Sequence, residues 1–261
     1  MTGAIRFDNG AAYERYMGRW SQSVGEAFID WLAPRPGLRW LDIGCGNGAF
    51  TEMIFRRCAP AMVDGIDPSE GQLAYARAQP VLRSARFQQG DAMALPHADD
   101  AFDVAVMPLV IFFVPEPARG VAEMTRVVRP GGITAAYAWD MEGGGFPYEV
   151  LHEEIRALGV AVPTPPSMAA SGLPVMRDLW QAAGLEQVDT RTIRVQRVYP
   201  DFDDYWQTVL GGPSAGAQIK ALSDAQRAQL QERLRTRLAP DAAGRITWTA
   251  RANAVMGQVP A

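Results

Sequence analysis

The sequence predicts an α/β protein whose sheet is mostly parallel and carries helices on both faces. Two observations predict this class. Between residues 39 and 139, short apolar segments typical of buried strands alternate with segments of helical periodicity. The links between these segments are short, and the first of them, after Arg39–Ile43, is rich in glycine, which suits a tight turn from strand to helix.

The individual elements follow in chain order from apolar spacing and from Pro and Gly boundaries. Residues 1–34 are predicted to form a helical cap with the apolar stripe Trp20, Val24, Phe28, Ile29, Trp31 and Leu32. Strands are predicted at Arg39–Ile43, Ala61–Ile66, Ala85–Gln89, Phe102–Met107 and Ile133–Trp139. Helices are predicted at Asn47–Cys58, Ser69–Gln79 and roughly Pro117–Val128, where Pro130 and Gly131 mark the stop.

After Asp140 the alternation loosens. Residues 141–184 have the character of an insertion that could serve as a lid, with one helix at Pro147–Leu158 and a proline-rich stretch behind it. The remaining elements expected are a helix at Pro174–Ala183, a long strand at Glu186–Tyr199, a helix at Leu222–Ala239 and a closing strand at Arg245–Val255. We therefore expect one domain over 1–261, made of a cap (1–34), a core (39–139), a lid (141–184) and C-terminal strands and helices (185–261).

Composition excludes several classes of protein. The 261 residues are 48% hydrophobic and carry a net charge of −4, which is ordinary for a globular protein and argues against a nucleic-acid partner. Two cysteines and two histidines make neither a disulfide framework nor a metal site, so we expect no metal. No apolar run of membrane-spanning length and no export signal occur, so we expect a cytoplasmic protein, either monomer or homodimer, without a membrane span.

The stretch "RWLDIGCGNGAF" brings three glycines, Gly44, Gly46 and Gly48, to the end of the first core strand. The spacing Gly44, Gly46, Ala49 also satisfies the loose dinucleotide-binding pattern, so glycines alone leave the ligand open. Asp42 precedes them by two positions. Its carboxylate would repel a pyrophosphate at that helix N-terminus and would attract an ammonium group.

Two further acids end the next two strands. Asp67 in "VDGIDPSE" is placed to accept hydrogen bonds from the hydroxyls of a ribose. Asp91 in "FQQGDAMALP" is placed to accept a hydrogen bond from the amino group of an adenine. A ligand with an amine, a ribose and a base, and no required phosphate, fits S-adenosylmethionine better than NAD.

Four ordered motifs carry a family resemblance: "LDIGCGNG", "GIDPSEGQLAYAR", "GDAMALPHADDAFDVAV" and "EMTRVVRPGGITAAY". Together they resemble class I S-adenosylmethionine-dependent methyltransferases, most closely the type 11 group that is similar to ubiquinone/menaquinone C-methyltransferases. The resemblance covers about residues 39–139, and "YMGRW" resembles the N-terminal cap of bacterial members. It implies a Rossmann-like, doubly wound sheet of seven strands whose last strand is antiparallel, which fits Arg245–Val255.

The resemblance also implies roles for residues at matching positions. Gly44, Cys45, Gly46 and Gly48 would pass beneath the methionyl part, with Asp42 near its amine. Asp67 would bind the ribose, and Pro68 and Ser69 would flank the adenosine. The adenine would meet Asp91, Ala92 and Met93, while Pro108 and Leu109 would lie near the transferable methyl group.

One departure concerns the acceptor. Many relatives carry two histidines where this chain has Phe112 and Phe113, so the mouth of the site is predicted to be apolar. We expect Trp20, Phe112 and Tyr148 to contact a small apolar or aromatic acceptor. If a base is needed, the candidates are His152, Asp140 and Tyr16, with His152 favoured because its ordinary pKa lies nearest to neutral pH. The alternatives are an NAD(P)-dependent oxidoreductase and a non-catalytic S-adenosylmethionine-binding module.

Overall fold

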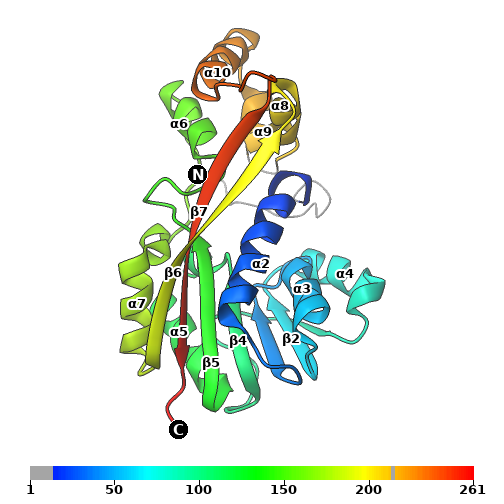
Figure 1. The fold of residues 1–261 in the computed structure, drawn as a ribbon, viewed down its shortest axis with the longest axis vertical. Coiled ribbons are helices and arrows are strands. Elements are labelled where there is room, and N and C mark those ends of the chain that lie inside the picture. The colour runs from blue at the N-terminus through cyan, green and yellow to red at the C-terminus, as the bar shows by residue number, and fades with distance from the viewer. Residues whose placement is uncertain (1–13, 213–214) are drawn as a thin grey trace.

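In a computed structural model, which describes residues 14–212 and 215–261, the core is a seven-stranded sheet with the order β3-β2-β1-β4-β5-β7-β6 (Figure 1). Strands β1 to β5 are parallel, and β7 is antiparallel to both of its neighbours, β5 and β6. The strands are β1 (Arg39–Ile43), β2 (Met62–Asp67), β3 (Arg86–Gln89), β4 (Phe102–Pro108), β5 (Val128–Trp139), β6 (Glu186–Tyr199) and β7 (Ile246–Gln258). The predicted fold class, including the antiparallel last strand, is confirmed.

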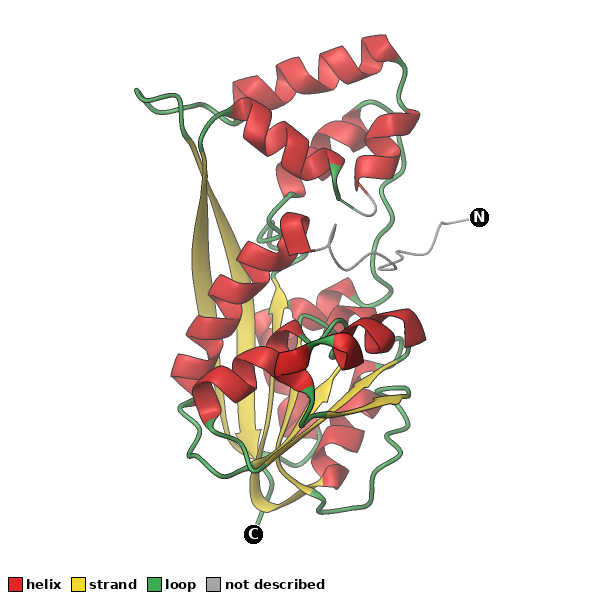
Figure 2. Cartoon of the chain, turned by 90° about the vertical axis from the view of Figure 1, so that its right-hand side faces the viewer, coloured by secondary structure: helices red, strands yellow, loops and turns green. Residues whose placement is uncertain are grey.

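Helices cover both faces of this sheet (Figure 2). One face carries α2, α3 and α4, and the opposite face carries α5 and α7. The helices are α2 (Arg19–Leu32), α3 (Ala49–Cys58), α4 (Glu70–Ala78), α5 (Pro117–Val127), α6 (Glu149–Ala157), α7 (Leu173–Ala182), α8 (Phe202–Leu210), α9 (Ala215–Ala221) and α10 (Asp224–Arg237). Short single turns are η1 (Glu14–Gly18, a π-helix), η2 (Pro80–Leu82), η3 (Ile111–Phe113) and η4 (Met168–Ser171).

Strands β6 and β7 continue beyond the rest of the sheet as a two-stranded ribbon. The pairing of β5 with β7 ends at Trp139↔Ala252, whereas β6 and β7 stay paired as far as Tyr199↔Ile246. Four helices, α6, α8, α9 and α10, gather at the far end of the ribbon and form a helical lobe above the core (Figure 1). Within the lobe, the Glu154 carboxylate of α6 forms ion pairs with Arg233 and Arg237 of α10, at 2.6 and 3.1 Å.

Two features of the C-terminal half differ from the sequence expectation. Helix α7, at the end of the segment predicted to be a lid, packs on β6 and β7, and the indole of Trp180 donates to the Thr134 carbonyl at 3.1 Å. Helix α7 is therefore part of the layer that covers the sheet, and a lid over residues 141–184 stays a prediction. Helices α8 and α9 were not predicted. Asp201 could have indicated the start of α8, because its side chain accepts a hydrogen bond from the Asp204 amide as an N-cap.

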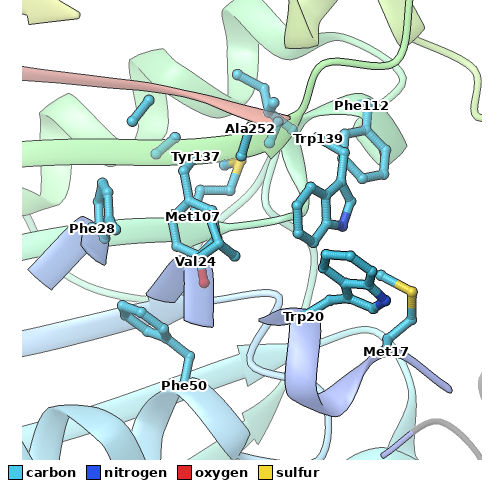
Figure 3. Packing of buried hydrophobic residues seen from close by; sticks show 14 of the residues in the cluster. Met17, Trp20, Val24, Phe28, Phe50, Met107, Phe112, Tyr137, Trp139 and Ala252 are labelled. Atoms are coloured by element: carbon cyan, nitrogen blue, oxygen red, sulfur yellow. The ribbon is translucent and has the colours of Figure 1, made fainter. Parts of the chain in front are cut away.

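The N-terminal helix α2 is anchored in the core by its aromatic stripe. Trp20, Val24 and Phe28 point from α2 toward Tyr137 and Trp139 of β5 (Figure 3). The Phe28 and Tyr137 ring centroids lie 4.7 Å apart. The predicted stripe is buried except for Trp31, which is half-buried, and each fully buried side chain of this size contributes about 1.5–3 kcal/mol. The predicted cap of residues 1–34 lies outside the described residues over its first 13 positions.

Candidate functional site

The glycine loop lies between the carboxyl end of β1 and the first turn of α3, as predicted. All three glycines adopt positive φ angles, +71° at Gly44, +53° at Gly46 and +83° at Gly48. Residues with a side chain rarely adopt this conformation, so backbone geometry alone favours glycine at each position.

The three glycines differ in what surrounds them. A Cβ on Gly44 would overlap the Val110 side chain, and a Cβ on Gly48 would overlap Leu82. A Cβ on Gly46 would meet no protein atom within 4 Å. Gly44 and Gly48 are therefore required by packing within the protein, whereas Gly46 faces open space.

The backbone amides of the loop are occupied within the protein. Gly44 and Cys45 both donate to the Ile66 carbonyl, at 2.7 and 3.0 Å, and Gly48 donates to the Cys45 carbonyl at 2.9 Å. The Gly46 amide donates to the Asp67 carboxylate at 2.9 Å. A dinucleotide-binding turn presents such amides to a pyrophosphate. Here they are used internally, which disfavours a phosphate ligand.

Asp42 is fully buried at the end of β1. Its Oδ2 accepts from the Thr51 hydroxyl of α3 at 2.6 Å, while no donor of the described residues reaches Oδ1. Burial, with a smaller contribution from the nearby charge of Asp67, raises the pKa of Asp42 to about 7. A buried acceptor without a donor is uncommon and marks a place where a ligand group could bind.

Asp67 ends β2 beside the glycine loop. Its two carboxylate oxygens accept from the backbone amides of Gly46 and Ser69, at 2.9 and 2.8 Å, and burial raises its pKa. Ser69 in turn caps α4 through the Gln72 amide. The carboxylate therefore links the glycine loop to the start of the next helix.

Neither acid is neutralised by a basic side chain. Among the ion pairs formed by the described side chains, none involves Asp42 or Asp67. Two desolvated carboxyl groups beside a glycine turn make a site that disfavours anions and suits a cationic ligand.

The third predicted acid, Asp91, lies in a turn directly after β3. The turn closes through the Ala94 amide, which donates to the Asp91 carbonyl at 3.0 Å, and through the Met93 amide, which donates to the Asp91 carboxylate at 2.8 Å. Asp91 is exposed, and Ala92 and Met93 are half-exposed, so a ligand can reach this turn.

The backbone conformation of Leu109, the residue that follows β4, could not be predicted from the sequence. It has a positive φ of +59°, although it is not glycine, and its amide donates to the Tyr137 carbonyl at 2.7 Å. Strained residues of this kind cluster at binding and catalytic sites. Pro108 and Leu109 end β4 on the same edge of the sheet as the glycine loop.

The predicted acceptor residues come from three separate elements. Trp20 of α2 and Phe112 of η3 lie beside Trp139 at the end of β5 (Figure 3). Tyr148 stacks on Tyr16 with ring centroids 4.0 Å apart, and its hydroxyl donates to the Tyr16 carbonyl at 2.6 Å. The three predicted residues, Trp20, Phe112 and Tyr148, are all buried, so their rings form an aromatic wall and not an exposed surface.

Two members of this aromatic region, Tyr199 and Tyr205, were missed. The Tyr199 hydroxyl donates to that of Tyr148 at 3.4 Å, and the Tyr205 ring lies 5.2 Å from that of Tyr199. The hydroxyls of Tyr16 and Tyr205 are buried and have no hydrogen-bond partner among the described residues. No local signal marks them, because the cluster joins segments distant in the chain.

The three candidate bases, Asp140, His152 and Tyr16, lie in different environments. Asp140 is paired with Arg251 at 2.7 Å and also accepts from the Gly143 amide. Burial lowers the pKa of His152, which stacks on Phe146, to about 4, so the reason for favouring it, an ordinary pKa near neutrality, is wrong. Burial raises the pKa of Tyr16 well above its ordinary value.

Comparisons with known proteins agree with this geometry. Residues 41–136 match the family described as methyltransferase domain. The chain is 37% identical over 111 residues to a ubiquinone/menaquinone biosynthesis C-methyltransferase of Roseobacter denitrificans, covering 41% of this chain and 44% of that one. It is 33% identical over 123 residues to a malonyl-[acyl-carrier protein] O-methyltransferase of Pectobacterium atrosepticum, covering 47% of each.

A solved structure shares the fold over most of the chain. Phosphoethanolamine N-methyltransferase 2 of Haemonchus contortus, in complex with S-adenosyl-L-methionine, superposes with a TM-score of 0.61 at 17% identity, over 98% of this chain and 58% of that one. The curated relatives are matched over less than half of their own length.

The sheet order, the glycine loop and the buried acids define the Rossmann-like fold of class I S-adenosylmethionine-dependent methyltransferases. The match to the family described as methyltransferase domain covers residues 41–136, which include the glycine loop, Asp42 and Asp67. None of the helices within the described residues is both long and apolar enough to cross a membrane.

Proposed function

We propose that this protein transfers the methyl group of S-adenosylmethionine to a small apolar or aromatic acceptor. The observation that carries the proposal is the pair of buried acids, Asp42 and Asp67, beside a glycine loop whose amides are used internally. That arrangement suits a ligand with an amine and a ribose and does not suit a pyrophosphate.

The residues present fit this cofactor. The free Oδ1 of Asp42 is the acceptor that the methionyl amine requires, and the space over Gly46 allows close approach of the ligand. Asp67 would accept the ribose hydroxyls and Asp91 the adenine amino group. The remaining contacts would come from Gly44, Cys45, Gly48, Pro68, Ser69, Ala92, Met93, Pro108 and Leu109.

The cofactor supplies an electrophilic methyl group on a sulfonium whose leaving group is already good. The chain's own task is to hold the acceptor in line in a site without water, an effect worth up to roughly 7–11 kcal/mol. The aromatic wall of Trp20, Phe112 and Tyr148 serves that task by excluding water. The buried hydroxyls of Tyr16 and Tyr205 can each pair with one polar atom of an otherwise apolar acceptor.

The nature of the acceptor atom is the open part of the proposal. The relatives are named for methylation of carbon and of oxygen, and the solved structure for methylation of nitrogen. The apolar wall favours an aromatic ring or another apolar skeleton. A cytoplasmic location and a monomeric or homodimeric state stay predictions.

The first test separates the three functions considered. Titration calorimetry with S-adenosylmethionine and with NADH is expected to detect binding of the former alone. Transfer of labelled methyl to a panel of phenols, hydroquinones and amines is then expected for a catalyst but not for a non-catalytic binding module. Tight binding of NADH would overturn the proposal.

Replacing Phe112 with alanine is expected to raise the KM for the acceptor found in that panel several-fold, while the KM for S-adenosylmethionine changes little. The reason is that Phe112 belongs to the aromatic wall and not to the glycine loop. Phe113→Ala, which alters the neighbouring ring of the same turn, is the matched control. An equal rise in both KM values would assign Phe112 to the structural core.

The environments of His152 and Asp140 lead to a second expectation, about proton transfer. A pKa of about 4 makes the half-buried His152 a weak base, and the Asp140 carboxylate is paired with Arg251 at 2.7 Å. We expect His152→Ala and Asp140→Asn to keep the profile of kcat against pH between about pH 6 and 8, with at most a threefold change in kcat. Loss of the acidic limb of either profile, where the rate of the wild type rises with pH, would restore that residue as the base.

A further inference from the structure

The connection from β3 to β4 is held in place by α5. A crossover between parallel strands usually contains a helix, but here residues 90–101 form a loop. The loop begins with the Asp91–Ala94 turn and ends before Phe102 of β4. Because it has no helix of its own, its shape depends on contacts with its surroundings.

Arg126, in the last turn of α5, supplies most of these contacts. Its guanidinium donates to the carbonyls of Leu95 and His97, at 3.0 and 2.8 Å, and to the Asp99 carboxylate at 2.8 Å. Two further bonds, both 2.8 Å, go to the carboxylate of Glu123 one turn earlier. All five N–H donors of the guanidinium are thereby used in one rigid fork.

Glu123 completes the arrangement from the same helix. Its Oε2 accepts from the Leu95 amide at 2.7 Å. Both backbone groups of Leu95, its amide and its carbonyl, are therefore bound by the Glu123–Arg126 pair, and the Leu95 side chain is buried. Leu95 is a fixed point of the loop.

This fixed point adjoins the turn that carries Asp91. Ala94, the residue before Leu95, closes the turn onto the Asp91 carbonyl. On the same helix, Gly120 lies close to the carbonyl of Ala92, since a Cβ placed on Gly120 would be 4.0 Å from that oxygen. The turn is thus held between the end of β3 on one side and α5 on the other.

We propose that Arg126 and Glu123 are positioning residues for adenine recognition: they hold the Asp91–Met93 turn in the conformation that binds the base. This inference rests on the proposed function, in which Asp91 accepts the adenine amino group. In this proposal both residues act on the turn through their hydrogen bonds to Leu95 and His97 and not through the base itself.

The test compares two ligands in calorimetry, S-adenosylhomocysteine and S-inosylhomocysteine, whose base carries an oxygen in place of the adenine amino group. Wild-type protein is expected to prefer the adenosyl ligand about tenfold, the size of a hydrogen bond to a charged group. Arg126→Gln is expected to weaken binding of the adenosyl ligand about tenfold and binding of the inosyl ligand far less. The preference for the adenosyl ligand is then abolished. Arg126→Lys should not rescue it, since lysine lacks the fork.

The matched control is Arg119→Gln, on an exposed part of the same helix, where the arginine contacts only Glu116 at 3.9 Å among the ion pairs described. It is expected to keep the wild-type preference. Glu123→Gln serves as the second variant if Arg126→Gln does not fold, with a smaller loss of preference in the same direction.

The outcomes separate the inference from the function on which it rests. Wild-type protein that binds neither ligand would overturn both. Wild-type binding with an unchanged preference in Arg126→Gln would overturn the inference alone. So would an equal loss for both ligands accompanied by a lower melting temperature, because that pattern indicates a purely structural role.

Discussion

Replacing Asp42 with asparagine is expected to stabilise the cofactor-free protein above pH 7 and to weaken its binding of S-adenosylmethionine. Burial raises the pKa of Asp42 from 3.8 to about 7, so the folded protein retains a proton that the unfolded chain releases near pH 4. The stabilisation from that proton is complete below pH 4 and is lost as the pH rises through 7. A shift of that size corresponds to roughly 4 kcal/mol as an upper bound, at about 1.4 kcal/mol per pKa unit.

The measurement is urea unfolding of wild type and Asp42→Asn between about pH 4 and 8. The difference in unfolding free energy should grow in favour of the variant as the pH rises. Asparagine keeps an oxygen for the Thr51 hydroxyl, so the comparison isolates the charge. Calorimetry should show wild-type affinity rising from about pH 5.5 to 7.5, while the variant binds more weakly, by roughly 1.5–3 kcal/mol, without that rise.

Asp103→Asn is a control in which the change in stability is expected to have the opposite sign to that of Asp42→Asn. The Arg39 amide and the guanidinium groups of Arg39 and Arg129 hold the pKa of Asp103 at about 2, so its ionised form stabilises the fold above pH 4. This stabilisation is lost as the pH falls from 4 through 2, and the variant should therefore be less stable than wild type at pH 7.

Parallel profiles of unfolding free energy against pH for wild type and Asp42→Asn would rule out a raised pKa at Asp42.

The second large effect concerns the glycine loop. Gly44→Ala and Gly48→Ala are each expected to lower the free energy of unfolding by about 2–5 kcal/mol. A left-handed backbone costs alanine about 1–2 kcal/mol, and overpacking against Val110 or Leu82 adds about 1–3 kcal/mol. Thermal and urea unfolding measure the change directly.

Gly46→Ala and Gly37→Ala are the matched controls. Both positions have positive φ, +53° and +79°, and neither has a protein atom within 4 Å of an added Cβ, so each should cost only about 1 kcal/mol. Gly46→Ala alone should also weaken S-adenosylmethionine binding, because its open side is where we place the ligand. If Gly46→Ala binds as Gly37→Ala does, the ligand does not pass over the loop as proposed.

The order of strands and helices in the core could be predicted from local pattern, because each depends on residues close in sequence. β1 and β6 have the predicted bounds, and β2, β3 and β4 differ by one residue at one or both ends. β5 begins at Val128, five residues before the predicted Ile133, so Pro130 and Gly131 lie in the strand and not in a stop between helix and strand. The proximity of Asp42 and Asp67 to the glycine loop could be predicted for the same reason. Parallel strands bring their carboxyl ends to one edge, so Asp42 and Asp67, each ending a strand, had to lie near the glycine loop.

The aromatic cluster that we propose to meet the acceptor could be recognised only in the tertiary structure. Tyr16, Tyr148 and Tyr199 come from η1, the segment before α6, and β6, and their contacts depend on how the helical lobe meets α2. The same holds for the candidate bases: the partner of Asp140 is 111 residues away, and the low pKa of His152 results from the burial of α6. Residue type sets the ordinary pKa, but desolvation and charge pairing, which set the actual one, exist only in the folded chain.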